Sequence, residues 1–542
     1  MLDALRSEDE RVVLQRDGQA AMDLGKESSV KRRALLQLLS SAAISPLLIS
    51  RNFGPARAQG VSGRLALNLT GMSYWATEYA FSNLAYNASR WRVQIEGDAF
   101  TWDTPLPPMT EDGYPTAVPP NSVLESFLIF TSERKALPVQ LSVYYDGKGK
   151  LEYKGGAQLE SRARGRDDVR NLRKEDPFTA RITETDRTDP IRNIRIHERS
   201  VTIPPKFRKP FLERMNGMSA LRFMDWMGTN NSGIIHWADR PRRGQFGRSE
   251  LGVPLEDMID LCNETRIEPW FNMPHLCDDG FVRAFAEQVK KDLDPRLDVH
   301  VEYSNEVWNT SFGQADHARA QGLALGLSSN DYEAQLRYYA HRSTEILKIW
   351  EDIFSADSQR IIGIYAAQSV NEWTSTTILS WKGVAQHADV LAIAPYFGGS
   401  LGSPERADDV SKWSLDRLFS ELEKEVEIEN KKIIRNQVAV ANQYRAKLYA
   451  YEGGQHLVGH SGAENNDMLT DLFIAANRDP RMGDLYRRHL RNWWASGGEL
   501  YALFSSMSGP SKWGSWGLLE NEGESHPKWQ AVQQVLNAKN IR

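Results

Sequence analysis

Short apolar runs alternate with helical patterns from residue 206 onward. The segment 254–264 predicts a helix because Pro254 stands in its first turn with acidic residues behind it. The segment 328–354 combines capping residues with apolar positions at helical spacing, and 526–536 predicts a closing helix. Between these patterns, the apolar runs predict strands at 219–226, 266–273, 298–304, 361–367, 389–396, 447–453 and 499–505. Repeated strand–helix units favour a parallel sheet.

An eighth candidate strand, RLALNLT at 64–70, lies far upstream of the others. Eight parallel strands with helices between them predict an α/β fold of the (β/α)₈, or TIM, barrel type. The alternative is an open doubly wound sheet. It is less favoured because no Gly-rich phosphate loop follows any of these strands.

The stretch between the first two predicted barrel strands has few helical periods. Within it, VYYDGKGKLEY predicts a β-hairpin with Asp146 and Gly147 at the turn. We therefore expect an antiparallel β-domain inserted after the first barrel strand. The predicted organisation is 59–104 for the first barrel strand and its loop, 105–205 for the inserted domain, and 206–542 for the rest of the barrel.

Residues 1–58 have the features of an export signal with a long polar n-region. Arg32 and Arg33 precede an apolar run of about 15 residues, which is too short for a membrane span. Ala56 and Ala58 provide an A-x-A cleavage site, and the paired arginines indicate twin-arginine export. We expect a periplasmic or secreted protein that begins near Gln59. The alternative is an amphipathic helix of the mature chain.

Composition narrows the classes of partner. With 41% hydrophobic residues, 25% charged residues and a net charge of −5, the chain has a globular composition and no electrostatic footprint for nucleic acid. The 16 Trp residues could lie in the core or stack on sugar rings.

Cys262 and Cys277 could form a disulfide or remain free thiols, and no further metal ligands stand at zinc-like spacing. We expect no metal and no cofactor, and the sequence does not indicate an oligomeric state.

Polar and aromatic residues stand where the predicted barrel strands end. Active-site groups of (β/α)₈ barrels lie at these carboxyl ends. The residues at these positions are Asp225, Trp226, Asn272, His275, Asn305, Glu306, Gln368, Tyr396 and Glu452, followed by Trp513 and Trp516 in a late loop. Two glutamates facing one another across a barrel mouth suit retaining glycoside hydrolysis, in which one is acid/base and the other nucleophile.

Each fragment has a plainer interpretation when taken alone. The Asn305-Glu306 pair could be a turn, Arg222 could be an ion-paired barrel residue, and His275 could be a loop histidine with its partners satisfied. Glu302 is a rival acid, because it would share a strand face with Glu306 four residues later, but it lies inside the strand. The joint occurrence of these residues, each at its own strand, favours a catalytic site.

As a set, these positions resemble the clan-A glycoside hydrolases, a (β/α)₈ group with an acid/base Asn-Glu pair after strand four and a nucleophilic glutamate after strand seven. The resemblance implies that Glu306 is the acid/base and Glu452 the nucleophile. It further implies substrate-site roles for Arg222, His275, Asn305, Tyr396 and a Trp of the last loop, which holds Trp513 and Trp516. Asn272 is a further substrate-site candidate because of its place at a strand end. The inserted β-domain departs from the common layout of that group. The motif EYSNEVWN also resembles bacterial secreted proteins labelled cellulose-binding-like.

The sequence thus predicts a retaining glycosidase whose partner is a β-linked polysaccharide or oligosaccharide. A long groove with several Trp would favour endo action. A non-hydrolytic carbohydrate-binding protein on the same scaffold is the main alternative, although binding alone does not require two facing acids. A metal-dependent barrel hydrolase would need a His/Asp ligand cluster, which one His beside one Asn does not supply.

Overall fold

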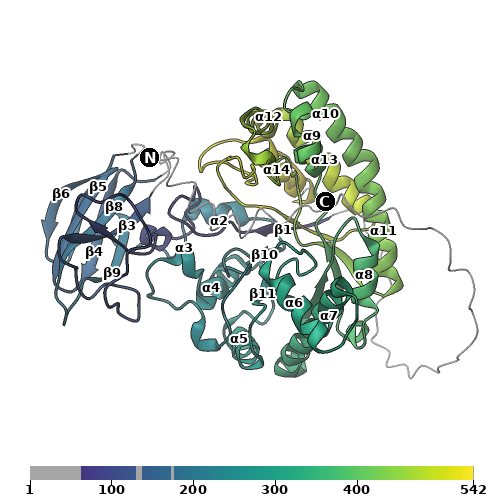
Figure 1. Ribbon diagram of the computed structural model, residues 1–542, viewed down its shortest axis with the longest axis horizontal. Coiled ribbons are helices and arrows are strands. Elements are labelled where there is room, and N and C mark those ends of the chain that lie inside the picture. Colours follow the sequence, from purple (N-terminus) through teal and green to yellow (C-terminus); the bar gives the residue numbers. More distant parts are fainter. Residues whose placement is uncertain (1–62, 130–136, 173–175, 541–542) are drawn as a thin grey trace, which may run out of the picture.

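The computed structural model describes residues 63–129, 137–172 and 176–540 of the 542-residue chain. The predicted export segment, residues 1–58, lies outside the described residues. Within them, a closed barrel of eight parallel strands and two antiparallel sheets account for the strands (Figure 1).

The barrel confirms the predicted fold class. Its strands are β1 (Arg64–Asn68), β10 (Ala220–Arg222), β11 (Glu268–Met273), β12 (Val299–Tyr303), β13 (Ile361–Ala366), β14 (Val390–Ile393), β15 (Lys447–Ala450) and β16 (Leu500–Leu503), in that order around the barrel. Closure occurs at β1, where Ala66 pairs with Ala220 of β10 and with Ala502 of β16. Every strand lies within one of the eight apolar runs of the sequence.

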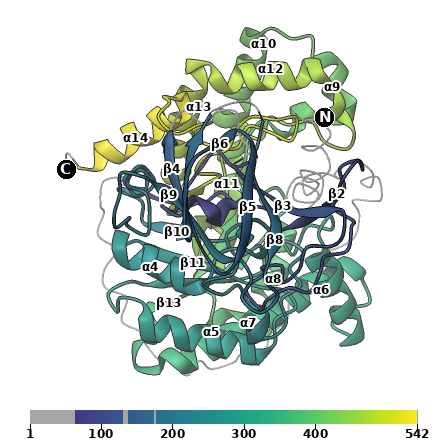
Figure 2. The ribbon, with the colours of Figure 1, turned by 90° about the vertical axis from the view of Figure 1, so that its left-hand side faces the viewer.

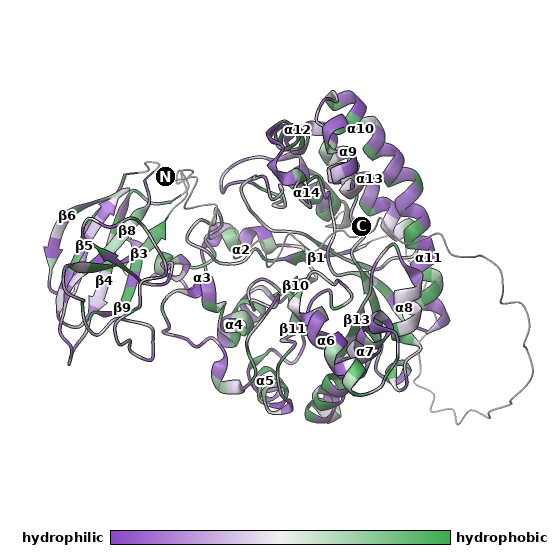
Figure 3. Cartoon of the chain, in the orientation of Figure 1, coloured by the Kyte–Doolittle hydropathy of each residue, from purple (hydrophilic) through white to green (hydrophobic). Residues whose placement is uncertain are grey.

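Helices connect the barrel strands and cover the barrel from outside. They are α2 (Lys209–Met215), α3 (Arg248–Leu251), α4 (Leu255–Thr265), α5 (Asp279–Asp292), α6 (Gly313–Ala324), α7 (Asp331–Phe354), α8 (Glu372–Leu379), α9 (Pro404–Val410), α10 (Leu415–Lys424), α11 (Asn430–Gln443), α12 (Asp467–Arg478), α13 (Pro480–Ala495) and α14 (Pro527–Asn540). Each of the three helices predicted from the sequence is present, and Asn330 caps α7 by accepting from the Glu333 amide. Figure 3 shows hydrophilic residues along the outer helices and hydrophobic ones on the strands they cover.

Between β1 and β10 the chain forms a β-sandwich. One sheet has the order β2 (Arg92–Ile95), β3 (Ser122–Ile129), β8 (Phe178–Thr185), β5 (Gly149–Gly155). The other has the order β6 (Ala157–Ala163), β7 (Arg166–Asn171), β4 (Gln140–Asp146), β9 (Arg192–Glu198). Both sheets bury side chains in one core, such as Leu151 from the first and Val143 from the second. In Figure 2 the sandwich lies in front of the barrel. It includes β2, which precedes the predicted boundary at residue 105.

The predicted hairpin around Asp146 and Gly147 is wrong. β4 pairs with β7 and β9, whereas β5 pairs with β8 in the opposite sheet. The Asp-Gly turn therefore carries the chain from one layer of the sandwich to the other. Gly147 has φ 88°, and a Cβ there would lie 2.0 Å from the Pro190 carbonyl oxygen. The glycine reflects this close approach to the Pro190 backbone rather than a two-residue hairpin loop.

Cys262 on α4 and Cys277 after β11 are both buried and free. Among the described residues, no helix is long and apolar enough to cross a membrane. The apolar layer between strands and helices instead contains packed pairs such as Phe271 of β11 and Trp350 of α7, whose rings stack with centroids 6.5 Å apart. This layer holds the strand ends, and therefore the residues after them, in fixed positions.

Candidate active site

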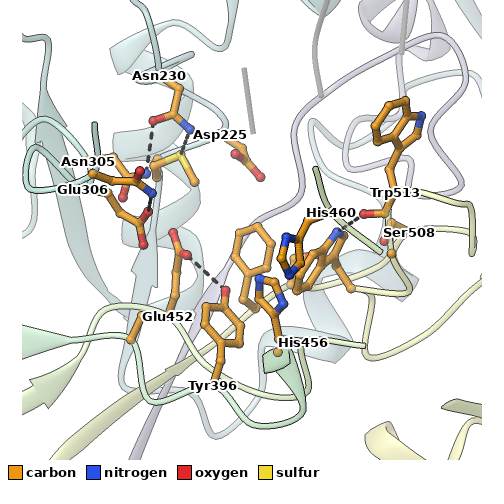
Figure 4. Close-up of a pocket in the computed structure, with 18 of the residues that line it drawn as sticks. Asp225, Asn230, Asn305, Glu306, Tyr396, Glu452, His456, His460, Ser508 and Trp513 are labelled. Atoms are coloured by element: carbon orange, nitrogen blue, oxygen red, sulfur yellow. Dashed lines mark hydrogen bonds between the residues drawn. The ribbon is translucent and has the colours of Figure 1, made fainter. Parts of the chain in front are cut away.

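A pocket of about 1970 Å³ opens at the carboxyl ends of the barrel strands. Glu306 after β12, Tyr396 after β14, Glu452 after β15, and Trp513 and Trp516 after β16 all line it. The carboxyl groups of Glu306 and Glu452 lie near one another in Figure 4, and the charge of Glu306 raises the pKa of Glu452. Barrel closure thus brings together the two acids that the sequence separates by nearly 150 residues.

The chain turns sharply after β12, and this turn places Glu306 in the mouth of the barrel. Ser304 and Glu306 have φ angles of 58° and 43°, in the left-handed region that non-glycine residues rarely adopt. The Ser304 amide donates to the Met273 carbonyl (2.8 Å), and the Asn309 amide donates to the Glu306 carbonyl (2.8 Å). Strained backbone of this kind is found most often at functional sites.

Glu306 is held by neutral donors. Tyr451 Oη donates to Glu306 Oε1 (2.7 Å), and Asn309 Nδ2 donates to Glu306 Oε2 (3.0 Å). Trp308 Nε1 donates in turn to the Tyr451 hydroxyl (3.3 Å). In the described part of the chain, no Arg or Lys forms an ion pair with Glu306.

Glu452 has a cationic partner. Arg222 Nη1 donates to Glu452 Oε1 (2.9 Å), and Tyr396 Oη donates to Glu452 Oε2 (3.0 Å). Arg222 is fully buried, so this charge-assisted bond is shielded from solvent. The two carboxyls therefore differ in kind: one accepts from neutral groups and the other from a guanidinium.

The same difference decides where a proton resides. Burial raises the pKa of both Glu306 and Glu452, and the charge of Glu306 raises that of Glu452 further. Arg222 opposes this rise, and it touches Glu452 directly but not Glu306. When the pair holds one proton, the ionised form is thus favoured at Glu452 and the proton at Glu306. Such a division of roles between two acids is what general acid and nucleophile require.

Arg222 also organises the floor of the site. Its Nη2 donates to Asn305 Oδ1 (2.8 Å), and its Nη1 donates to Asn68 Oδ1 (3.1 Å). Asn305 lines the pocket, and its Nδ2 donates to Asn230 Oδ1 (3.1 Å). The orientation of Asn305 is therefore set from both ends of its amide, as expected for a group that positions a ligand.

Three residues predicted at the substrate site do not line the pocket: Arg222, Asn272 and His275. Arg222 and Asn272 are fully buried beneath it, and Asn272 Nδ2 donates to Glu302 Oε2 (2.9 Å) and to the Ser304 carbonyl (2.8 Å). The turn at Pro274–Cys277 carries His275 away, to a position beside His317 with ring centroids 5.6 Å apart. Arg222 and Asn272 support the site from below, whereas His275 belongs to the surrounding packing.

The rival acid, Glu302, lies inside the barrel. It is fully buried and accepts from Arg222 Nε (3.0 Å), Arg222 Nη2 (3.1 Å) and Trp270 Nε1 (2.8 Å), besides Asn272. It does not line the pocket. Its carboxyl oxygens are thus occupied by protein donors.

Several residues of the site were not predicted from the sequence, among them Tyr451, which lies behind the pocket wall, and Asn309, which lines the pocket. Tyr451 precedes Glu452, so strand alternation would point the two in opposite directions, yet Tyr451 reaches Glu306. The strand ends at Ala450, which frees Tyr451 from that alternation. Asn309 could have been inferred, because it follows Glu306 by three residues in a turn. The other unpredicted side chains on the pocket wall include Trp75, Asn230, Trp308, Glu425, His456 and His460.

No protein family model matches the chain, and neither does any curated protein. Solved structures with partial similarity include the GH51 arabinofuranosidase of Xanthomonas axonopodis pv. citri, at 12% identity and TM-score 0.38. The match covers 57% of this chain and 62% of that one, less than two thirds of its length. The GH5-4 broad specificity endoglucanase of Clostridium acetobutylicum matches at 11% identity and TM-score 0.36, over 63% of this chain and 92% of that one. Similarity of this degree carries no information about substrate.

Proposed function

We propose that this protein is a retaining glycosidase that acts on a β-linked polysaccharide or oligosaccharide. The observation that carries the proposal is the unlike pair of pocket carboxyls: Glu306 with neutral donors and Glu452 with Arg222. A carbohydrate-binding protein would need neither the pair nor its asymmetry. A double-displacement hydrolase needs both.

The first chemical step uses the two acids together. Glu306 transfers its proton to the glycosidic oxygen while a carboxylate oxygen of Glu452 forms a bond to the anomeric carbon. The bond between that carbon and the glycosidic oxygen breaks, and the leaving sugar departs with a hydroxyl. Tyr396, which donates to Glu452 Oε2, holds the nucleophile at the pocket wall.

The second step releases the glycosyl ester. Glu306, now ionised, removes a proton from water as the water oxygen bonds to the anomeric carbon and the bond to Glu452 breaks. Glu452 regains its charge beside Arg222, and Glu306 regains its proton. Two inversions at the same carbon give net retention.

The size of the pocket favours a substrate of several sugar units. Pockets for drug-sized ligands occupy about 300–1,000 Å³, so about 1970 Å³ leaves room beyond a single sugar. Trp75, Trp308, Trp513 and Trp516 on its wall offer ring faces and edges to sugars. Export through the predicted signal would bring the enzyme to such polymers outside the cytoplasm.

The test is product release from β-glucans, mannans, xylans and bacterial exopolysaccharides, with wild type compared with Glu452→Gln. We expect new reducing ends from at least one polymer with the wild type only. Glu425→Gln is the matched control, because Glu425 is another pocket acid whose pKa burial raises to about 7 but which has no place in the two steps. Binding to a polymer without product release would replace the proposal with the non-hydrolytic alternative.

A further inference from the structure

One wall of the pocket carries ring nitrogens that have no protein partner. They are His456 Nδ1 and His460 Nε2, in the loop after β15, and Trp513 Nε1, in the loop after β16. Neither histidine is more than 9% exposed. Folded proteins satisfy nearly all buried polar groups, because an unmade hydrogen bond is costly. Several such groups on one pocket wall indicate a hydrogen-bonding ligand there.

This wall adjoins the nucleophile. The His456 ring packs edge-on against Tyr396 and Trp516, with centroid distances of 5.4 Å and 5.0 Å. Tyr396 in turn donates to Glu452. Figure 4 shows His456 and His460 between Tyr396 and Trp513. A sugar placed against His456 would therefore be next to the sugar that reacts with Glu452.

Backbone hydrogen bonds fix the loop that carries both histidines. The His456 amide donates to the Phe397 carbonyl (2.7 Å), and the His460 amide donates to the Gly402 carbonyl (3.1 Å). Gln455 joins this loop to the one after β16, because its Nε2 donates to the Ser515 carbonyl (2.9 Å). The imidazoles are thus in place before a ligand arrives, which lowers the entropic cost of binding.

The rings on this wall are uncharged. Burial lowers the pKa of His456 to about 4 and also lowers that of His460. A neutral imidazole offers one donor and one acceptor, which suits hydroxyl groups. Charged groups of both signs lie beside this wall: Glu405 and Glu464 act on His460, and the Lys512 ammonium lies 4.8 Å from the centroid of the Trp513 ring.

We propose that His456, His460 and Trp513 form a subsite that binds the hydroxyl groups of a sugar unit, one unit beyond the sugar that bonds to Glu452. The inference rests on the proposed function and specifies its substrate. The leaving oxygen must lie beside Glu306, so a wall that adjoins Glu452 accepts the chain on the other, non-reducing side. The enzyme then prefers at least two units on that side, and the main product from that side is a disaccharide or longer.

The test compares 4-nitrophenyl β-glycosides of one sugar and of two, in matched glucose, mannose and xylose pairs. For the preferred sugar, we expect a kcat/KM about 100-fold higher for the two-unit substrate in the wild type. His460→Ala should reduce this preference to less than about 10-fold, mainly through a lower kcat/KM on the two-unit substrate. His456→Ala should reduce it as well, and for this variant only the ratio of the two kcat/KM values is compared, because its ring packs against Tyr396. His341→Ala, on the half-exposed surface of α7, is the matched control and should keep the full preference.

Two results would overturn the subsite: equal rates on one-unit and two-unit substrates in the wild type, or an intact preference in both histidine variants. The wild-type comparison stands even if His456→Ala fails to fold. If no glycoside of either length is cleaved, the proposed function itself fails. The subsite is then judged by calorimetric binding of cellobiose, mannobiose and xylobiose. Affinity for one of them that His460→Ala abolishes supports the subsite, and affinity that is absent or unchanged contradicts it.

Discussion

Glu302 and Glu306 lie four residues apart, yet they belong to two different regions of the barrel. Glu302, inside the barrel, accepts from Arg222, Trp270 and Asn272 and has no exposure. Glu306, in the mouth, accepts from Tyr451 and Asn309 and lines the pocket. Burial raises the pKa of both. Burial and an elevated pKa therefore do not distinguish a catalytic acid from a structural one, whereas access to the pocket does.

Arg222 connects the two regions. One edge of its guanidinium binds Glu302 in the interior, and Nη1 binds Glu452 at the mouth. The interior pair thus orients the cation that opposes the rise in the pKa of Glu452. The comparison predicts chemical defects from changes at the mouth and stability defects from changes in the interior.

The largest effect is expected from Glu452→Gln. An amide has the shape of the carboxylate but cannot form the glycosyl ester, so kcat should fall by about 10⁴-fold or more. Steady-state kinetics on the polymer identified in the screen measure this loss, with polymer binding as the control for folding. Near-normal turnover would remove Glu452 from the mechanism.

Glu306→Ala should show a smaller loss that depends on the leaving group. General acid catalysis contributes about 10²–10⁴-fold, and a leaving group that departs readily needs little of it. We expect a loss in that range on the natural polymer and a much smaller loss of the first step on 2,4-dinitrophenyl glycosides. Pre-steady-state release of dinitrophenol measures that step. Equal losses on both substrates would contradict the acid role.

Glu302→Gln should affect folding more than chemistry. Removing one member of a buried ion pair leaves a charge without full compensation, which costs about 3–5 kcal/mol of unfolding free energy. Arg222 keeps its bond to Glu452, so the fraction that folds should retain turnover. Urea unfolding gives the first quantity, and kcat per folded molecule gives the second. A stable but inactive variant would make Glu302 a catalytic candidate.

The smallest effect is expected from Tyr451→Phe and concerns pH. The Tyr451 hydroxyl lowers the pKa of Glu306 by donating to its charged form, so its removal raises that pKa. Activity needs Glu306 protonated and is lost as pH rises, so the basic limb of kcat/KM should move to higher pH. Tyr449→Phe removes a hydroxyl two residues earlier, within β15, and should leave the limb in place. An unmoved limb in both variants would show that Tyr451 does not tune Glu306.

Sequence pattern predicted the barrel well because its strands are buried on both sides and stand out as apolar runs. It predicted Glu306 and Glu452 because strand ends converge at one face of a closed barrel. It failed where a contact depends on how segments far apart in the sequence pack together. The Asp146-Gly147 turn connects two sheets instead of closing a hairpin, and the residues after β11 turn His275 out of the mouth. His456 and His460 carry no local signal, since their position depends on backbone bonds to the loops after β14.

The most direct test of the account is to trap the glycosyl ester. A 2-deoxy-2-fluoro glycoside of the preferred sugar with a dinitrophenyl leaving group slows both steps, but the good leaving group lets the first proceed. Intact mass and peptide mapping then locate the adduct. The account predicts one glycosyl group on Glu452, in the peptide that contains YEGG. An adduct on Glu306 or Glu302, or none while substrate turnover is blocked, would contradict it.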